Sequence, residues 1–153
     1  SVTEKEYKEL LQIWSKKMIK VLDKSINIVQ KFKDDRITKY EYFKELGSFS
    51  EFSSSKKNGG YKEISNQLNN VIPPKKYMSN EYYWKAITDI GVVFDNFMNG
   101  DSSYNDGYRI KSDYFDGGII DNLERAYRLS KVDSVKKLQE KVIIFKQTIP
   151  DSP

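Results

Sequence analysis

One long seam of apolar residues constrains the fold more than any other feature of the chain. Between residues 7 and 32, apolar side chains recur at alternating steps of four and three residues, with Ser25 as the one polar member. The seam consists of Tyr7, Leu11, Trp14, Met18, Val21, Ser25, Ile28 and Phe32. Because an α-helix turns once in about 3.6 residues, this spacing places the whole seam on one face of one helix. Other helices must cover so long a face, and the sequence therefore predicts an all-α fold.

Two capping signals indicate where helices begin. Thr3 is followed three residues later by Glu6, and Thr38 by Glu41, which is the pattern of a capping box. The first helix is then expected to run to about Lys33 and to close at residues 34–36. Further stripes at helical spacing follow along the chain. They are Tyr40, Phe43, Leu46 and Phe49; Tyr61, Ile64, Leu68 and Val71; Tyr83, Ile87, Ile90, Phe94 and Phe97; Phe115, Ile119, Leu123, Ala126 and Tyr127; and Val135, Leu138, Val142, Phe145 and Ile149.

Turn-forming segments separate these stripes. Residues 53–60 are rich in serine and glycine, Pro73 and Pro74 end one stripe, and residues 100–111 form a polar loop. Near residues 130–134 the helical phase slips, so the last stripe is either a separate helix capped by Asp133 or a continuation of the fourth. The sequence predicts an antiparallel up-down bundle of four principal helices without disulfides, the second and fourth either continuous or split. One domain spans residues 1–149, and 150–153 form a tail.

The chain contains neither cysteine nor histidine. This excludes disulfides, zinc sites built on Cys or His, and catalytic pairs that need either residue. The net charge of +4 is uneven, because residues 1–79 carry 16 basic and 10 acidic side chains whereas residues 80–153 carry 10 and 12. The basic half is either an ordinary solvated surface or a face for an acidic partner or a membrane surface.

Three motifs that suggest chemistry have simpler explanations. The loop containing Asp101, Ser103 and Asn105 resembles a calcium loop, but Asp106 stands where glycine is required and Ser112 where a bidentate glutamate is required. The acidic residues at 113, 116, 121 and 124 suit the positive end of a helix as well as they suit acid-base catalysis. Two Ser-x-x-Lys matches, at 53–56 and 134–137, lack the companion elements of that nucleophile motif. We therefore expect no metal, no cofactor and no enzymatic activity.

Aromatic residues give the most suggestive positive signal. They crowd the start of the third predicted helix and the loop and helix that follow it. Exposed tyrosine and tryptophan are favoured at protein contacts, and they also stack on sugars. The alternative is that these rings pack the end of the bundle. The predicted partner-binding residues are Tyr77, Tyr82, Trp84, Tyr104, Tyr108 and Tyr114. Nucleic acid is not an expected partner, because the aromatic residues and the excess lysines lie in different halves.

The Lys-, Asn- and Tyr-rich, cysteine-free composition resembles the mature part of small exported lipoproteins of Gram-positive bacteria or their mobile elements. No specific motif accompanies this resemblance, and it implies no residue roles. The chain begins at Ser1 without a methionine, so we expect that a leader or upstream region was removed. The expected function is a non-enzymatic, extracytoplasmic, cell-envelope-associated bundle that binds a protein partner through its aromatic loop end, either with or without a lipid anchor upstream. The alternatives are a small-molecule or carbohydrate-binding bundle, a carboxylate-dependent hydrolase, and a cytoplasmic location.

Overall fold

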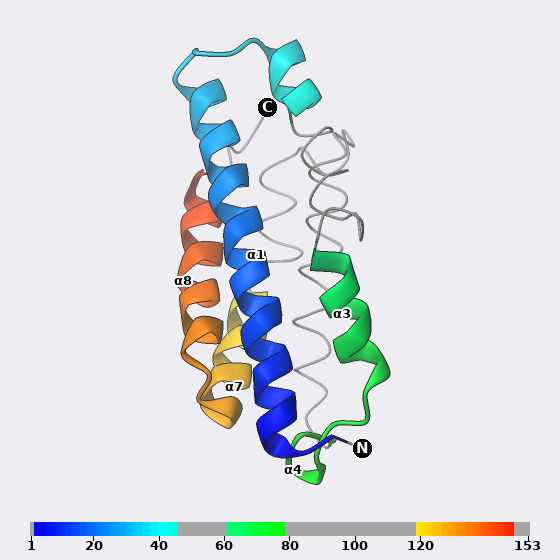
Figure 1. Ribbon diagram of the computed structural model, residues 1–153. Helices are drawn as coiled ribbons and strands as arrows, with labels where there is room; N and C mark the ends of the chain where they lie inside the picture. Colours follow the sequence, from blue (N-terminus) through cyan, green and yellow to red (C-terminus); the bar gives the residue numbers. More distant parts are fainter. Residues whose placement is uncertain (1, 46–60, 79–118, 149–153) are drawn as a thin grey trace.

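The computed structural model describes residues 2–45, 61–78 and 119–148. These segments are helical with short connections, and none of them contains a strand, which confirms the prediction of an all-α, cysteine-free fold in this part of the chain. Residues 39–45 are also helical. The labelled helices in Figure 1 are α1 (Glu4–Lys33), α3 (Tyr61–Asn70), α4 (Lys75–Met78), α7 (Ile120–Ser130) and α8 (Asp133–Thr148).

Helix α1 carries the predicted seam into the core. Every member of the seam is buried except Phe32, which is half-buried. The polar member, Ser25, is accommodated because its hydroxyl donates a hydrogen bond of 2.8 Å to the carbonyl oxygen of Val21. Leu22 and Val29 are also fully buried, so the apolar stripe is wider than the seam itself.

The second predicted capping box is present in full, and the first is present in part. The Glu6 backbone N–H donates to Thr3 Oγ1 at 3.1 Å, and the Thr3 hydroxyl donates to Glu6 Oε1 at 2.9 Å. At the second box, the Thr38 N–H donates to Glu41 Oε1 and the Glu41 N–H donates to Thr38 Oγ1, each at 3.1 Å. The three bonds from backbone N–H groups satisfy donors that have no acceptor within the helix, whereas the bond between the Thr3 and Glu6 side chains satisfies no backbone donor. The sequence therefore located both helix starts correctly.

Side-chain contacts fix the directions of the helices around α1. Ser15 meets Ser134 and Asp23 meets Lys141, so α1 and α8 run parallel. Trp14 donates from Nε1 to Ser65 Oγ at 3.1 Å, whereas the N–H of Val2 donates to the carbonyl oxygen of residue 72 at 3.3 Å, so α1 and α3 run antiparallel. Figure 1 shows α1 between α8 and α3, and it packs most extensively against α8.

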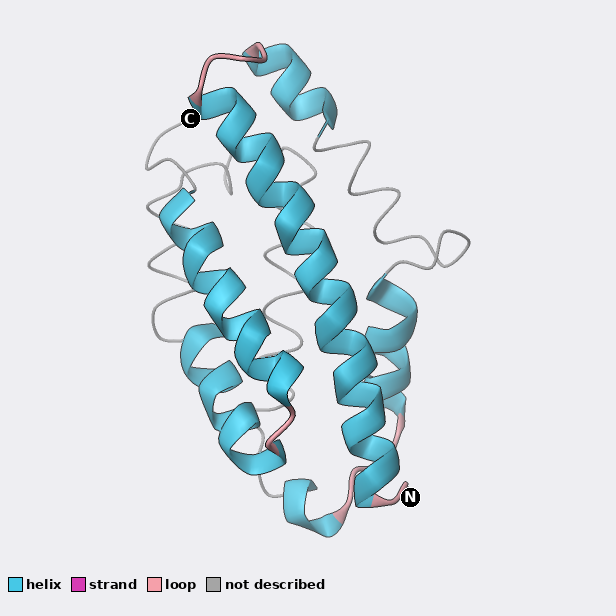
Figure 2. Cartoon of the chain, turned by 60° about the vertical axis from the view of Figure 1, so that its left-hand side comes forward, coloured by secondary structure: helices cyan, strands magenta, loops and turns pink. Residues whose placement is uncertain are grey.

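The end of the chain forms a helical hairpin. Helix α7 ends at Ser130 and α8 begins at Asp133, so the last apolar stripe is a separate helix and not a continuation of the fourth. Figure 2 shows the two helices side by side, and the Gln139 side chain donates from Nε2 to the carbonyl oxygen of Ile120 at 3.2 Å. Val135, Leu138, Val142 and Phe145 are fully buried, as their spacing predicts.

The predicted phase of the second stripe is wrong at its start. Tyr40 is 75% exposed, whereas Tyr42, which the stripe omits, is buried. The Tyr42 ring stacks on Phe32 at the end of α1, with ring centroids 4.5 Å apart and an interplanar angle of 22°. Packing against the Phe32 ring of another helix therefore decides which face of residues 39–45 is buried. Phe43, which the stripe places in the core, is only partly buried.

Other sequence predictions are confirmed in part or fall outside the described residues. Ile64 and Leu68 are buried in α3, which ends before the two prolines. Leu46, Phe49, the stripe from Tyr83 to Phe97, the start of the fourth helix and the tail lie outside the described residues. Among the helices that are described, none is long and apolar enough to cross a membrane.

Candidate functional site

An open groove runs between the first half of α1 and the turn that joins α7 to α8. It has a volume of about 890 Å³. Five lysines and three acidic residues line it, with few apolar side chains. The lining residues are Glu4, Lys5, Lys8, Glu9, Gln12, Lys16 and Ile19 from α1, and Lys131, Val132, Asp133, Ser134 and Lys137 from the turn and α8.

The groove is positively charged, and most of its lysines form no ion pair with another described residue. Lys8 is the exception, since its Nζ lies 3.4 Å from Glu4 Oε1. Within the described segments, no carboxylate pairs with the ammonium groups of Lys5, Lys16 or Lys137. All three of these residues are exposed, so their charges face solvent across the groove.

The wall opposite α1 is shaped by a tight turn. Lys131 ends α7 in the left-handed conformation, with φ of 57°, and its N–H donates to the carbonyl oxygen of Tyr127 at 2.7 Å. The buried Ser130 hydroxyl donates to the Ala126 carbonyl at 2.8 Å and accepts from the Val132 N–H at 3.2 Å. These bonds hold the turn in one conformation and place Lys131 and Val132 at the groove.

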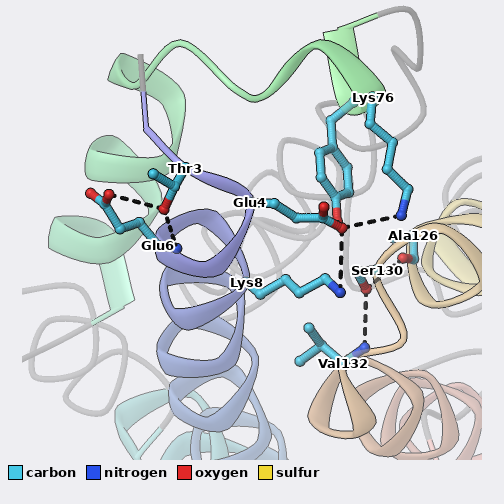
Figure 3. Close-up of polar contacts among 9 residues, drawn as sticks. Thr3, Glu4, Glu6, Lys8, Lys76, Ala126, Ser130 and Val132 are labelled. Atoms are coloured by element: carbon cyan, nitrogen blue, oxygen red, sulfur yellow. Dashed lines mark hydrogen bonds and ion pairs between the residues drawn. The ribbon is translucent and has the colours of Figure 1, made fainter.

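A cluster around Glu4 closes one end of the groove. Figure 3 shows Glu4 and Lys8 directed from α1 toward the turn that carries Ser130 and Val132. Glu4 Oε1 lies 3.1 Å from Lys76 Nζ and accepts from the Tyr77 hydroxyl at 3.4 Å. The hydrogen bond from Lys76, followed by that from Lys8, holds the pKa of Glu4 below its ordinary value. The negative charge of Glu4 is therefore already matched by cations.

Two serine hydroxyls lie beneath the groove. Ser15 Oγ is 2.6 Å from Ser134 Oγ and donates to the Leu11 carbonyl oxygen at 2.7 Å. Both serines are buried. This contact joins α1 to α8. The Ser134 hydroxyl, which belongs to the Ser-x-x-Lys match with Lys137, therefore has a structural role as the partner of Ser15.

Of the predicted partner-binding residues, Tyr77 alone lies in the described part of the chain. It is 1% exposed, and its ring packs against Tyr7 with centroids 5.1 Å apart. Burial raises the pKa of the Tyr77 hydroxyl to about 12, and the neighbouring Glu4 charge adds to this effect. The other predicted residues, Tyr82, Trp84, Tyr104, Tyr108 and Tyr114, lie outside the described residues, so the aromatic patch stays a prediction.

The described acidic residues do not form a metal centre. No group of three or more acidic side chains in the described segments is arranged to hold a metal ion. Asp121 and Glu124 are exposed on α7, and Glu124 forms an ion pair of 2.8 Å with Arg128. The remaining acidic candidates, Asp113 and Asp116, and the loop resembling a calcium site lie outside the described residues.

No protein-family model matches the chain, and comparisons with curated proteins and with solved structures find no similar protein. The groove itself was not predicted from the sequence. Its two walls are more than 100 residues apart in the chain, and each lysine taken alone is typical of a solvated helix face. One local signal was available, because the phase slip near residues 130–134 marks the turn that forms the second wall.

Proposed function

We propose that this protein is a non-enzymatic helical bundle that binds a protein partner. The observation that carries the proposal is the open groove between α1 and the α7–α8 turn, in which Lys5, Lys16 and Lys137 have no ion-pair partner among the described residues. Its volume of about 890 Å³ falls within the size range of small-molecule pockets, but its lining is charged, whereas such pockets are mainly apolar. A concave surface with free charges suits a polar segment of another protein better than a small apolar ligand.

The proposal has three further parts. The partner also contacts the aromatic-rich loop end, through Tyr82, Trp84, Tyr104, Tyr108 and Tyr114. The helices belong to an antiparallel up-down bundle of four principal helices, which is supported by the antiparallel pairing of α1 with α3. The protein acts outside the cytoplasm at the cell envelope, as its cysteine-free composition suggests.

Selection from a random-peptide display library tests the proposal directly. The full chain, immobilised through one end, should enrich a family of related peptides that compete with one another for a single site. Failure to enrich any related peptides, together with a thermal shift on adding a sugar or another small molecule, would favour the ligand-binding alternative.

Two variants then locate the binding site. Replacing Trp84 and Tyr104 with alanine should weaken the binding of the selected peptides if the aromatic end contributes to the binding site. Replacing Asp113 and Asp116 with asparagine should leave peptide binding unchanged, whereas loss of a measured turnover in that variant would support the hydrolase alternative.

A further inference from the structure

We infer that the groove recognises an acidic peptide segment, whose carboxylates bind the lysines of α1 and of the α7–α8 hairpin. This inference rests on the proposed function and specifies the chemistry of the partner.

The charge balance favours an anionic occupant. Glu4 is already paired with Lys8 and Lys76, so it does not offset the other lysines. Four lysines then face two acidic residues, Glu9 and Asp133, across the groove. The α8 helix also begins at this wall, and the positive end of its dipole adds to the field there. A negatively charged group bound in such a groove interacts favourably with several lysine ammonium groups at once.

Lys131, one of these four lysines, has an unusual backbone conformation. It adopts a left-handed backbone conformation, with φ of 57°, which glycine or asparagine usually occupies at this position after a helix. Its Nζ lies 5.5 Å from the centroid of the Tyr127 ring. Lys131 thus occupies a position where its backbone is disfavoured, and its side chain borders the groove.

The lining separates a peptide from other polyanions. Among the described lining residues there is no arginine to grip phosphate with two hydrogen bonds and no aromatic ring on which bases stack. The surface is concave, so a flat bilayer cannot reach its floor. Single carboxylates are well matched by lysine, which acts as a point charge. Ile19 and Val132 are partly buried and can contact the aliphatic parts of a peptide.

The positions of the lysines set the length of the segment. Lys5 and Lys16 lie three turns apart on α1, which corresponds to about 16 Å along the helix axis. An extended peptide covers this distance with about five residues, and a helical peptide with about eleven. A twelve-residue probe therefore reaches both ends of the α1 wall in either conformation.

The test uses the full chain and a fluorescein-labelled twelve-residue peptide of alternating glutamate and alanine, with the glutamine version as its uncharged control. Binding is measured by fluorescence anisotropy. One triple variant removes the three groove lysines that lack ion-pair partners among the described residues. The substitutions are Lys5→Gln, Lys16→Gln and Lys137→Gln. A second triple variant removes the same charge from exposed lysines outside the groove lining. These substitutions are Lys20→Gln, Lys39→Gln and Lys75→Gln.

The groove triple variant should bind the acidic peptide roughly tenfold more weakly than wild type, since three exposed charge contacts are lost. The control triple variant should change the affinity less than about twofold, because its charges lie outside the groove and salt screens them. Equal losses in both variants would overturn the inference, because binding would then follow net charge alone. So would saturable binding of a single-stranded oligonucleotide or of phosphatidylserine vesicles in place of the peptide, if the groove variant abolished it.

The outcomes distinguish this inference from the proposed function. If library selection yields related peptides that are not acidic, and the groove triple variant still binds them, the inference fails while partner binding stands. If the glutamate peptide binds in the groove but no related peptides are selected, the charge complementarity is real and the proposed function fails. Circular dichroism of both triple variants confirms that they fold, since none of the replaced lysines forms an ion pair with a described residue.

Discussion

The buried pair of serine hydroxyls between α1 and α8 provides a test of how these helices are held in register. Ser15 is fully buried and Ser134 is 6% exposed, with their Oγ atoms 2.6 Å apart. Ser15 Oγ also lies 2.7 Å from the Leu11 carbonyl oxygen, which can only accept a hydrogen bond. Both hydroxyl protons are then used, because the Ser15 hydroxyl donates to the Leu11 carbonyl oxygen and the Ser134 hydroxyl donates to Ser15 Oγ.

This order of donors predicts unequal losses in the free energy of unfolding. Ser134→Ala removes one hydrogen bond and leaves Ser15 bonded to Leu11, so we expect a loss of about 1 kcal/mol. Ser15→Ala leaves the Ser134 hydroxyl without its acceptor in a nearly closed site, and we expect a loss of about 2 kcal/mol. The double variant has no unpaired hydroxyl and gains helix propensity, so it should lie within about 1 kcal/mol of wild type.

Urea unfolding followed by far-ultraviolet circular dichroism measures all four states of this cycle. The coupling between the two sites should be at least about 2 kcal/mol, well above the additivity limit for independent sites. A matched control combines Ser25→Ala with Ser134→Ala, two sites that do not share a hydrogen bond in the structure, and their effects should add. Additive losses for Ser15 and Ser134, or a larger loss for Ser134→Ala than for Ser15→Ala, would refute the reasoning.

Three other predictions concern backbone conformation and pH. Lys131→Gly should raise the free energy of unfolding by roughly 0.5 kcal/mol, because glycine tolerates the positive φ better than lysine does, whereas Lys136→Gly inside α8 should lower it by about 1 kcal/mol. The pKa of Glu4 is lowered in the folded state, so its stabilisation is present above its ordinary pKa of 4.5 and is lost as the pH falls through the lowered value. Thermal unfolding of Glu4→Gln should therefore depend less on pH in this acidic range than that of wild type. Burial raises the pKa of both Tyr7 and Tyr77 from 10.0 to about 12, so their stabilisation is complete below pH 10 and is lost as the pH rises toward 12. Tyr77→Phe should flatten the alkaline loss of stability, which urea unfolding at a series of pH values measures.

Each of these predictions has an outcome that contradicts it. The Lys131 prediction fails if its glycine variant is destabilised as much as the Lys136 variant. For Glu4, if the melting temperature of the glutamine variant falls with acidification as steeply as that of wild type, the ion pairs with Lys8 and Lys76 do not form in solution. For the tyrosines, titration of all eleven tyrosines of the folded protein with a pKa near 10, seen by ultraviolet absorbance, would show that the Tyr7–Tyr77 contact is open to water.

The sequence predicted α1 well because every signal needed for that helix is local. The cap bond from the Glu6 N–H to Thr3, the spacing of the seam and the stop after Lys33 each depend on residues within a few turns of one another. The burial of Tyr42 could not be predicted from such local signals. Its burial depends on the ring of Phe32 in another helix, and helical spacing alone assigned the inward position to Tyr40.

The groove was beyond the reach of the sequence for a related reason. Lys16 and Lys137 face the same space because α1 and α8 run parallel, and that direction depends on the reversal at Lys131. A helix end without glycine or asparagine gives little warning of such a reversal. The aromatic residues predicted as a contact surface lie mostly outside the described residues, and Tyr77 packs against Tyr7.

The parallel pairing of α1 with α8 has a consequence for how the protein is made. In the described part of the chain, α1 finds its most extensive cover in a helix that the ribosome adds more than 100 residues later. Until then, the apolar face of α1 stays partly exposed in the nascent chain, because the segments already made cannot cover it fully. Exposed apolar faces of this kind bind chaperones or associate with one another. Folding of this protein is therefore expected to finish late in translation, when the closing helix emerges and covers the first.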